Sequence, residues 1–262
     1  MVACLALMLF VVFLLIFILF NFPWIAKYWR LTAAEYVVRN SYKVAFVSDI
    51  HLGAYGCNTR LIKVIGEMLN RLNVSVLVIV GDLIDRKFYL SSKYLERIAS
   101  LVVEALNLRD IIVLYIPSNS FHDIALVDLN RDILGFKLGS RNVEFIYSSH
   151  MLKIVFEGCS ENVYVTHGDY ISRNGIVSYL LDKISRKVLG KGITGIIMRR
   201  IFGLDSESWV ILGHSHIPSI DRKYRAIVLG SWVKRFFDPR GYSIAVASCR
   251  NNAINIIFKV FR

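Results

Sequence analysis

In the segment VAFVSDIHLG, residues 44–53, an apolar run ends abruptly at an aspartate and a histidine that lie two residues apart. The run before Ser48 is hydrophobic and partly β-branched, which is typical of a buried strand. Asp49 and His51 alternate along the chain, so an extended backbone would turn both side chains to the same side. In open α/β sheets, ligand-binding residues collect at the carboxyl ends of the strands. The segment therefore predicts a sheet strand that ends at a ligand site.

Four further apolar segments end in the same kinds of residue. They are SVLVIV (75–80) before Asp82 and Asp85, IIVLYI (111–116) before Asn119, His122 and Asp123, NVYVT (162–166) before His167 and Asp169, and WVIL (209–212) before His214 and His216. The chain has six histidines, and only His150 lies outside these five strand ends. Because carboxylate, amide and imidazole groups without thiolates suit hard or borderline divalent metals, the pattern predicts one shared metal site.

The segments between these strand ends predict a mixed α/β fold. Residues 59–72 and 92–107 carry apolar residues at helical spacing between the first three strands, as in βαβ units. From about residue 143 onward, short β-rich segments are separated mostly by polar turns. We expect them to form a second, more antiparallel sheet.

Composition indicates a globular chain with an anionic partner. The 262 residues are 55% hydrophobic, and 32 lysines and arginines against 20 acidic residues give a formal charge of +12. Such a balance favours phospholipid, nucleic acid or a phosphorylated substrate. Cys4, Cys57, Cys159 and Cys249 show no C-x-x-C spacing, which predicts reduced thiols and favours a cytoplasmic domain.

The amino-terminal segment, residues 1–26, contains no charged side chain and is predicted to be a single uncleaved transmembrane anchor. A helix needs about 20 apolar residues to cross a bilayer. Residues 27–41 are predicted to be a juxtamembrane linker. Lys27, Arg30, Arg39 and Lys43 follow the span, so the positive-inside rule places the remainder of the chain in the cytoplasm. We therefore expect a single-pass protein of the cell membrane.

Residues 171–204 are predicted to be a basic helical insert. Apolar residues recur on one side, and the rest of the interval is rich in lysine and arginine. A basic amphipathic stretch can lie on a membrane or cover a site as a lid. It can equally be a helix pair that packs on the core and exposes its cations to water. Both interpretations stay open at the level of sequence.

The ordered set of strand ends resembles the calcineurin-like metallophosphoesterases. Their pattern runs D-x-H, G-D-x-x-D, G-N-H-[DE], a lone H and G-H-x-H, and the similarity covers roughly residues 42–248. The sequence THGD and the basic insert are most similar to the enzymes that hydrolyse UDP-2,3-diacylglucosamine. The resemblance implies an α/β domain over residues 42–262, a four-layer αββα sandwich of two mixed sheets flanked by helices. The transmembrane helix would precede this domain.

The resemblance also implies two metal sites. Asp49, His51 and His216 would bind one divalent ion. Asn119, His167 and His214 would bind the other, with Asp82 as the bridge. Manganese is the first choice, and iron, zinc and magnesium are the alternatives. Asp85 would support the ligands from behind rather than bind metal.

The third segment departs from the family pattern. In place of G-N-H-D the chain has Ser118, Asn119, Ser120, Phe121, His122 and Asp123. In the family that histidine lies near the leaving group as general acid. Two residues separate Asn119 from His122 here, so a bulge could restore the histidine to its place or the acid could be lost.

Together these features predict a membrane-anchored, two-metal phosphoesterase. Its substrate would contain a phosphodiester or pyrophosphate bond, as in a nucleotide-linked lipid. A nuclease would use the same chemistry, but a membrane tether argues against nucleic acid as a partner. The altered third segment leaves a further alternative, a protein-binding scaffold of the same fold.

Overall fold

The structure, a computed structural model, describes residues 8, 11–12, 15–16, 33–39, 41–55, 57, 59–120, 122–126, 134–233 and 241–261. Most of the predicted anchor (1–26) and the first part of the predicted linker (27–41) lie outside these residues. Within the part of the chain that is described, no helix has the length and apolar character to cross a membrane.

A seven-stranded sheet carries the first three predicted strands. Its order is β15 (Ala253–Phe261), β14 (Tyr242–Arg250), β2 (Val44–Ser48), β3 (Val76–Val80), β5 (Ile111–Ile116), β8 (Val143–Tyr147) and β7 (Leu134–Leu138). Strands β2, β3, β5 and β8 are parallel to their neighbours in this series. The helices α2 (Thr59–Arg71) and α3 (Leu95–Ala105) connect β2 to β3 and β3 towards β5, which confirms the predicted βαβ units. Short 3-10 turns at Ser92–Tyr94 and Gly139–Arg141 precede α3 and β8.

A second sheet of six strands faces the first. Its order is β1 (Ala34–Val38), β9 (Met151–Phe156), β10 (Asn162–Thr166), β11 (Trp209–Leu212), β13 (Ala226–Val228) and β12 (Ser219–Asp221). A small sheet pairs β4 (Lys87–Leu90) with β6 (Asp123–Leu126). The prediction of a mixed α/β fold with two large mixed sheets flanked by helices is confirmed.

The predicted composition of the second sheet was wrong in part. β8, β14 and β15 pair within the first sheet, and β14 lies antiparallel beside β2. The second sheet is also less antiparallel than expected, because β1–β9, β10–β11 and β11–β13 are parallel pairs. The β10–β11 pair can be parallel because the long connection between the two strands allows a crossover, which parallel neighbours require in place of a hairpin.

The predicted linker also contains a strand that the sequence prediction missed. Residues Ala34–Val38 form β1 and pair with β9 at the edge of the second sheet. Their burial alternates between half-buried and exposed until Val38, as expected for an edge strand with one covered face. Val38 itself belongs to the core between the two sheets.

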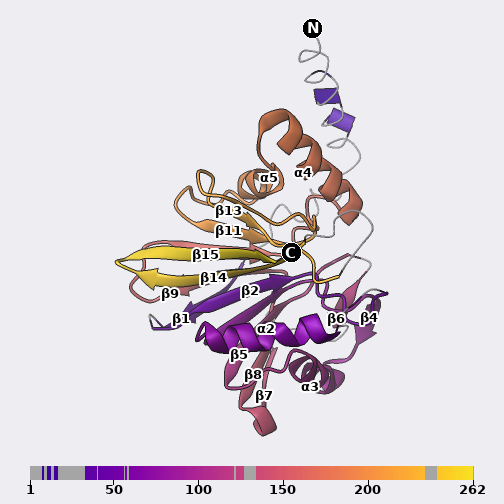
Figure 1. The fold of residues 1–262 in the computed structure, drawn as a ribbon, viewed down its shortest axis with the longest axis vertical. Coiled ribbons are helices and arrows are strands. Elements are labelled where there is room, and N and C mark those ends of the chain that lie inside the picture. Colours follow the sequence, from indigo (N-terminus) through magenta and orange to yellow (C-terminus); the bar gives the residue numbers. More distant parts are fainter. Residues whose placement is uncertain are drawn as a thin grey trace.

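Helices cover the outer faces of both sheets (Figure 1). One core cluster joins α2 and α3 to the first sheet, and includes Ile65, Val102 and Val113. A second cluster fills the space between the sheets. In the third, Leu181 of α4 (Gly175–Leu189) and Met198 of α5 (Thr194–Ile201) pack with Val210 and Leu212 of β11. The interval 171–204 is therefore helical, as predicted, and its inner side belongs to the core.

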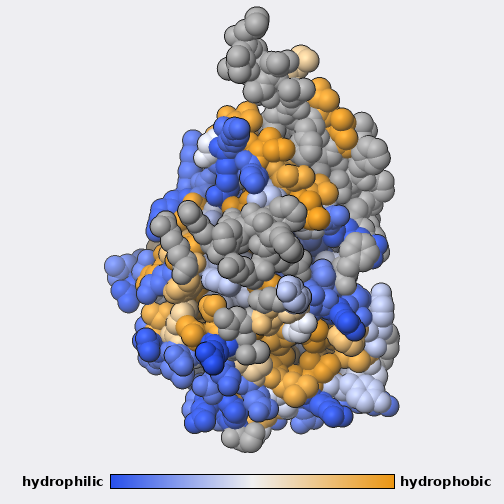
Figure 2. Space-filling view, turned by 45° about the vertical axis from the view of Figure 1, so that its right-hand side comes forward, coloured by the Kyte–Doolittle hydropathy of each residue, from blue (hydrophilic) through white to orange (hydrophobic). Residues whose placement is uncertain are grey.

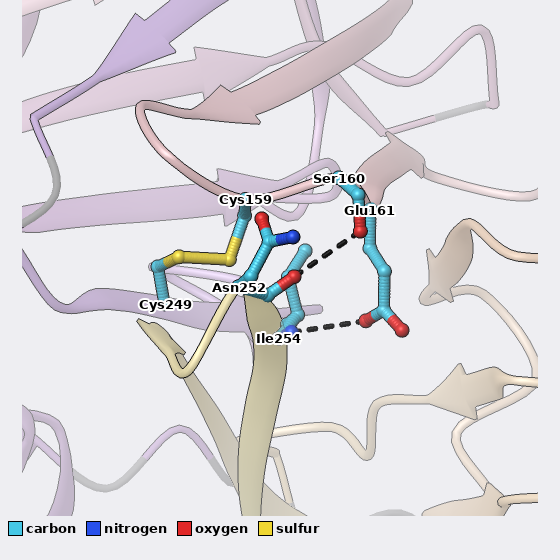
Figure 3. Close-up of a disulfide and its surroundings, with 6 residues drawn as sticks. All are labelled: Cys159, Ser160, Glu161, Cys249, Asn252 and Ile254. Atoms are coloured by element: carbon cyan, nitrogen blue, oxygen red, sulfur yellow. Dashed lines mark hydrogen bonds between the residues drawn. A yellow bond between two sulfur atoms is a disulfide. The ribbon is translucent and has the colours of Figure 1, made fainter.

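A disulfide joins Cys159 to Cys249, so the prediction of reduced thiols was wrong for this pair. Cys57 is free, and Cys4 lies outside the described residues. Cys159 lies in the turn between β9 and β10, whereas Cys249 lies near the end of β14 (Figure 3). Spacing could not reveal the pair, because 90 residues separate the two cysteines and only the packing of the sheets brings them together.

Candidate metal centre

The predicted ligand residues come from loops at the carboxyl ends of β2, β3, β5, β10 and β11. Parallel pairing of β2, β3 and β5, and of β10 with β11, directs these loops to one end of the two sheets. Six residues of these loops have left-handed backbones: Asp49 (φ 54), His51 (φ 48), Asp82 (φ 46), Asp123 (φ 91), His214 (φ 68) and His216 (φ 57). Strain of this kind persists only where the surrounding structure fixes it, and it clusters at functional sites.

Asp49, His51 and His216 form the first group of side chains. Their potential ligand atoms lie within 4.8 Å of one another. His216 Nε2 is 2.9 Å from Asp49 Oδ1, and His51 Nε2 is 3.9 Å from the same oxygen. Asp49 and His51 are fully buried, so neither side chain can be satisfied by bulk water.

Asp82, His167 and His214 form the second group, which is buried throughout. His167 Nε2 lies 3.5 Å from Asp82 Oδ1 and 3.2 Å from His214 Nδ1. The other carboxylate oxygen of Asp82, Oδ2, is 3.8 Å from His51 Nε2 of the first group. Asp82 therefore lies between the two groups and faces both.

Hydrogen bonds on the outer side fix the orientation of three imidazole rings. The hydrogen-bond network assigns His167 Nδ1 as donor to the Val80 carbonyl at 3.0 Å, and His214 Nε2 as donor to the Ser172 carbonyl at 2.6 Å. His51 Nδ1 lies 3.1 Å from Asp85 Oδ1. The remaining nitrogens of His51 and His167 face Asp82, and that of His214 faces His167 Nε2. Metal-binding histidines typically have such a hydrogen-bond partner on the ring nitrogen that does not bind metal.

Burial and neighbouring charges shift the pKa values of the central groups. Burial would raise the pKa of Asp82, but the imidazoles of His167, His51 and His214 outweigh it and lower that pKa well below the usual value. Burial would lower the pKa of His167, but the charges of Asp82 and Asp49 raise it well above the usual value. His214, buried beside His167, has a lowered pKa. Without metal, the second group thus holds a protonated His167 against ionised Asp82.

The rearranged third segment brings His122 to the edge of the site. The His122 ring centroid is 5.0 Å from that of His51, and His122 Nδ1 is 3.4 Å from Asp85 Oδ1. His51, Asp85 and His122 make a further group whose potential ligand atoms lie within 4.8 Å of one another. The two additional residues therefore leave His122 beside the first group, and Asp85 contacts both histidines.

Asn119 lies in the loop after β5, between Ser118 and Ser120, whose hydroxyl groups contact Asp82. Its backbone N–H donates to Asp169 Oδ2 at 2.5 Å, which ties the loop after β5 to the loop after β10. Its side-chain amide nitrogen is buried and has no hydrogen-bond partner among the described residues.

Sequence reasoning missed three residues that support the site. Ser118 and Ser120 contact Asp82 Oδ1 through their hydroxyl oxygens, at 2.5 Å and 2.6 Å. Asp123 accepts hydrogen bonds from the Tyr115 hydroxyl and from the backbone N–H groups of Asp82, Leu83 and Ser118. Asp123 could have been found as part of the His-Asp pair in the resemblance. The sequence gives no indication that the two serines contact a ligand residue, because serines are common in the loops that follow strands.

The two principal groups fit divalent metal ions. Each offers carboxylate oxygens and imidazole nitrogens, directed at one another at distances that a small cation could draw together. The carboxylates and imidazoles are buried, and such charges are tolerated in protein interiors when they are paired or bind metal.

Comparison with known proteins agrees with this geometry. The family model described as calcineurin-like phosphoesterase matches residues 42–169. No curated protein matches the chain.

Several solved structures are similar to the chain at low identity. Vacuolar Protein Sorting 29 of Cryptosporidium parvum has 14% identity and a TM-score of 0.39, over 84% of this chain and 97% of that one. A predicted phosphoesterase of Streptococcus pneumoniae has 14% identity and a TM-score of 0.34, over 83% and 98%. A dimetal phosphatase of Danio rerio has 12% identity and a TM-score of 0.40, over 84% and 95%.

The family match contains the loops after β2, β3 and β5 together with His167, and the fold adds His214 and His216 from the loop after β11. Residues 42–169 therefore match the calcineurin-like phosphoesterase family model, and this match together with the two groups of potential ligands supports a metal-dependent hydrolase.

Proposed function

We propose that the chain hydrolyses a phosphodiester or pyrophosphate bond at a centre of two divalent metal ions. The observation that carries this proposal is the position of Asp82 between two groups of potential ligands. Asp49, His51 and His216 would hold one ion, and Asn119, His167 and His214 the other, with Asp82 shared between them. We propose manganese as the ion, with iron, zinc and magnesium as alternatives.

When bound, two such ions activate a water molecule as hydroxide and neutralise the charge that develops on the phosphoryl group. The protein supplies fixed ligands for this chemistry. His167 and His214 each use one ring nitrogen for a backbone carbonyl and present the other to the site. Asp85 holds His51 in the same manner.

His122 is proposed as the general acid that protonates the leaving oxygen. It is partly exposed at the edge of the site, where a substrate could reach it, and its Nδ1 lies 3.1 Å from the Asp85 carbonyl oxygen. If Nδ1 donates to this carbonyl, Nε2 is the ring nitrogen left to face the substrate. General acids contribute typically about 10²–10⁴-fold, so loss of His122 should slow hydrolysis without abolishing it.

The test is hydrolysis of bis-p-nitrophenyl phosphate by the full chain with Mn²⁺, with and without a chelator. Asp82→Asn should remove nearly all hydrolysis and leave the fold intact, because it weakens the carboxylate whose two oxygens face one histidine of each group. Asp110→Asn, at the opposite end of the sheet, is the matched control and should keep wild-type activity.

Wild-type activity in Asp82→Asn would rule out the two-metal centre. A wild-type chain that binds metal but hydrolyses neither this diester nor a pyrophosphate would favour the scaffold alternative, which the altered third segment keeps open.

We further propose that the substrate is a nucleotide-linked lipid and that the chain is a single-pass membrane protein with its catalytic domain on the cytoplasmic side. The apolar segment 1–26 and the cations after it support this placement. The surface of α4 supports it as well. Ile176 and Leu180 are 57% and 40% exposed, and Lys183 and Lys187 continue the same helical face at i+7 and i+11. Each cation near an anionic membrane contributes about 1 kcal/mol.

In Figure 2, hydrophobic and hydrophilic surface lie side by side over the upper part of the molecule, where Figure 1 places α4 and α5. Arg199 is unsuited to contact with the membrane, because its guanidinium donates to the carbonyls of Ser208 and Tyr224 at 2.6 Å and 3.0 Å. The basic residues that remain exposed in this interval, such as Lys187 and Arg200, are better candidates.

The membrane proposal is tested by comparing a lipid-linked diester in anionic vesicles with a small soluble diester. The variant Leu180→Gln with Lys187→Gln should lower hydrolysis of the vesicle substrate and leave the soluble one unchanged. Raised salt should reproduce the effect, because screening shortens the reach of surface charge. Leu101→Gln, which alters an exposed leucine on α3, is the control. Equal loss on both substrates would contradict the membrane role of α4.

A further inference from the structure

Two serines that flank Asn119 converge on one oxygen of Asp82. Ser118 Oγ and Ser120 Oγ lie 2.5 Å and 2.6 Å from Asp82 Oδ1, and 2.9 Å from each other. Both are almost fully buried, with 1% and 3% of their surface exposed. An ionised carboxylate can only accept hydrogen bonds, so both hydroxyl protons point to Asp82.

The backbone around the serines fixes the direction of these two hydrogen bonds. Ser120 Oγ accepts from the His122 backbone N–H at 3.2 Å, which leaves its own proton for Asp82. The Ser118 backbone N–H donates to Asp123 Oδ2 at 2.8 Å, and the same oxygen accepts from the Asp82 backbone N–H at 2.9 Å. Asp123 thus holds the backbone of Ser118 and Asp82 together.

The two hydroxyls set the rotation of the Asp82 carboxylate. Oδ1 is engaged by Ser118 and Ser120, whereas Oδ2 faces His51 Nε2 at 3.8 Å. A carboxylate shared by two ions has to keep one orientation, because rotation about its Cβ–Cγ bond would carry a ligand oxygen away from one of them. A glycine at position 118 would supply no hydroxyl for this purpose.

Resting on the proposed two-metal function, we propose that Ser118 and Ser120 are positioning residues for the bridging carboxylate of Asp82. Ser120 also connects that carboxylate to the backbone of His122. Ser120, which lies between Asn119 and His122, therefore links the central ligand to the backbone of the histidine.

The test measures metal binding directly. Mn²⁺ is titrated calorimetrically into the metal-free full chain, for wild type and for Ser118→Ala with Ser120→Ala. Loss of groups that orient metal ligands typically weakens metal affinity by about 10–100-fold, so one of the two binding events should weaken by that factor. Ser120→Thr in the Ser118→Ala background keeps one hydroxyl and should recover part of the affinity.

The control is Ser178→Ala in α4, which removes a buried hydroxyl that has no partner among the described residues, and it should bind Mn²⁺ as the wild type does. If the double variant unfolds, Ser118→Gly alone replaces it, because this change removes one hydroxyl and leaves Ser120 in place. A second readout is the pH profile of diester hydrolysis, which should shift in the double variant and not in the control.

Two distinct results would overturn the inference. If the wild type binds two Mn²⁺ ions and the folded double variant binds both with the same affinity and pH profile, the serines have no positioning role. If the wild type binds no Mn²⁺ at all, the proposed function fails first and this inference fails with it.

Discussion

At the scale of residues, the sequence predicts which residue types make up the site better than it predicts which side chains contact one another. Asp49, His51, Asp82, His167, His214 and His216 could be singled out because each directly follows an apolar strand, and the structure brings them into two groups. The hydroxyls of Ser118 and Ser120 could not be assigned, because a loop serine has many potential partners and only the folded backbone selects Asp82. The return of His122 to the site depends likewise on the path of a loop.

The raised pKa of His167 predicts how the stability of the metal-free chain depends on pH. Its protonated form is stabilised by Asp82 and Asp49 in the folded state, whereas an unfolded histidine has a pKa of about 6.5. The stabilisation is fully present below that pH and is lost as pH rises through the raised folded value. With a chelator present, the urea midpoint should therefore fall as pH rises above about 6.5.

His167→Gln should remove this fall, because glutamine does not titrate. His150→Gln alters a histidine outside the two groups and should retain it. A wild-type midpoint that stays constant or rises over the same range would show that His167 is not protonated against Asp82 in the metal-free protein.

At the scale of elements, strands and helices follow from local patterns, but their partners do not. β2, β3, β5, α2 and α3 were predicted within a few residues of their observed bounds. β15 alternates between exposed and buried residues, whereas β14 is buried over most of its length, and neither pattern identifies the sheet that the hairpin extends. The assignment to the first sheet comes from antiparallel pairing of β14 with β2, across almost 200 residues of chain.

The turn after β3 predicts a sensitive position at Gly81. Its φ is +67, and a Cβ there would lie 2.4 Å from His167 Nδ1. Gly81→Ala should therefore displace the ring of His167 and reduce both Mn²⁺ affinity and diester hydrolysis by more than about tenfold, the lower end for loss of ligand orientation. Calorimetric titration and the diester assay measure the two effects.

Gly190, at the end of α4, supplies a matched control. It has a similar φ of +72, but among the described residues beyond its chain neighbours and its own helix backbone, no atom lies within 4 Å of the position that a Cβ would take. Gly190→Ala carries the same backbone strain, about 1–2 kcal/mol, without the collision. If both variants lose activity to the same extent, strain rather than contact with His167 explains the loss.

At the scale of the whole molecule, the Cys159–Cys249 disulfide fastens the two sheets at the end away from the metal centre. Cys159 precedes β10, whereas His167 follows it. Cys249 lies in β14 beyond Ala247, the residue that pairs with the first residue of β2. Hydrogen bonds reinforce the same corner, from Ser160 Oγ to the Asn252 carbonyl at 3.1 Å and from the Ile254 N–H to Glu161 Oε2 at 2.9 Å (Figure 3).

This disulfide should stabilise the fold and leave catalysis unaffected. Removal of a native disulfide typically costs about 2–5 kcal/mol, and a loop of this length lies at the upper part of the range in the chain-entropy model. Cys159→Ser with Cys249→Ser should lower the free energy of unfolding by that amount, measured by urea denaturation. Diester hydrolysis below the transition should match the wild type, and Cys57→Ser is the control for a free thiol. Unchanged stability would show that the pair contributes nothing to the fold.

The same pair allows the proposed orientation in the membrane to be tested. Structural disulfides persist in oxidising compartments and are rare in the cytoplasm of mesophiles, whereas the cations after residue 26 favour the cytoplasmic side. We expect Cys159 and Cys249 to be oxidised in intact cells, so that thiol alkylation after acid quenching labels neither cysteine unless a reductant is added. Protease added to intact cells then distinguishes the two sides of the membrane. Protection of the domain would place the oxidised cysteines in the cytoplasm. The packing of the two sheets around the disulfide would then have to protect it from reduction. Digestion would reverse the proposed orientation and would place the oxidised pair on the outer side of the membrane, where disulfides persist.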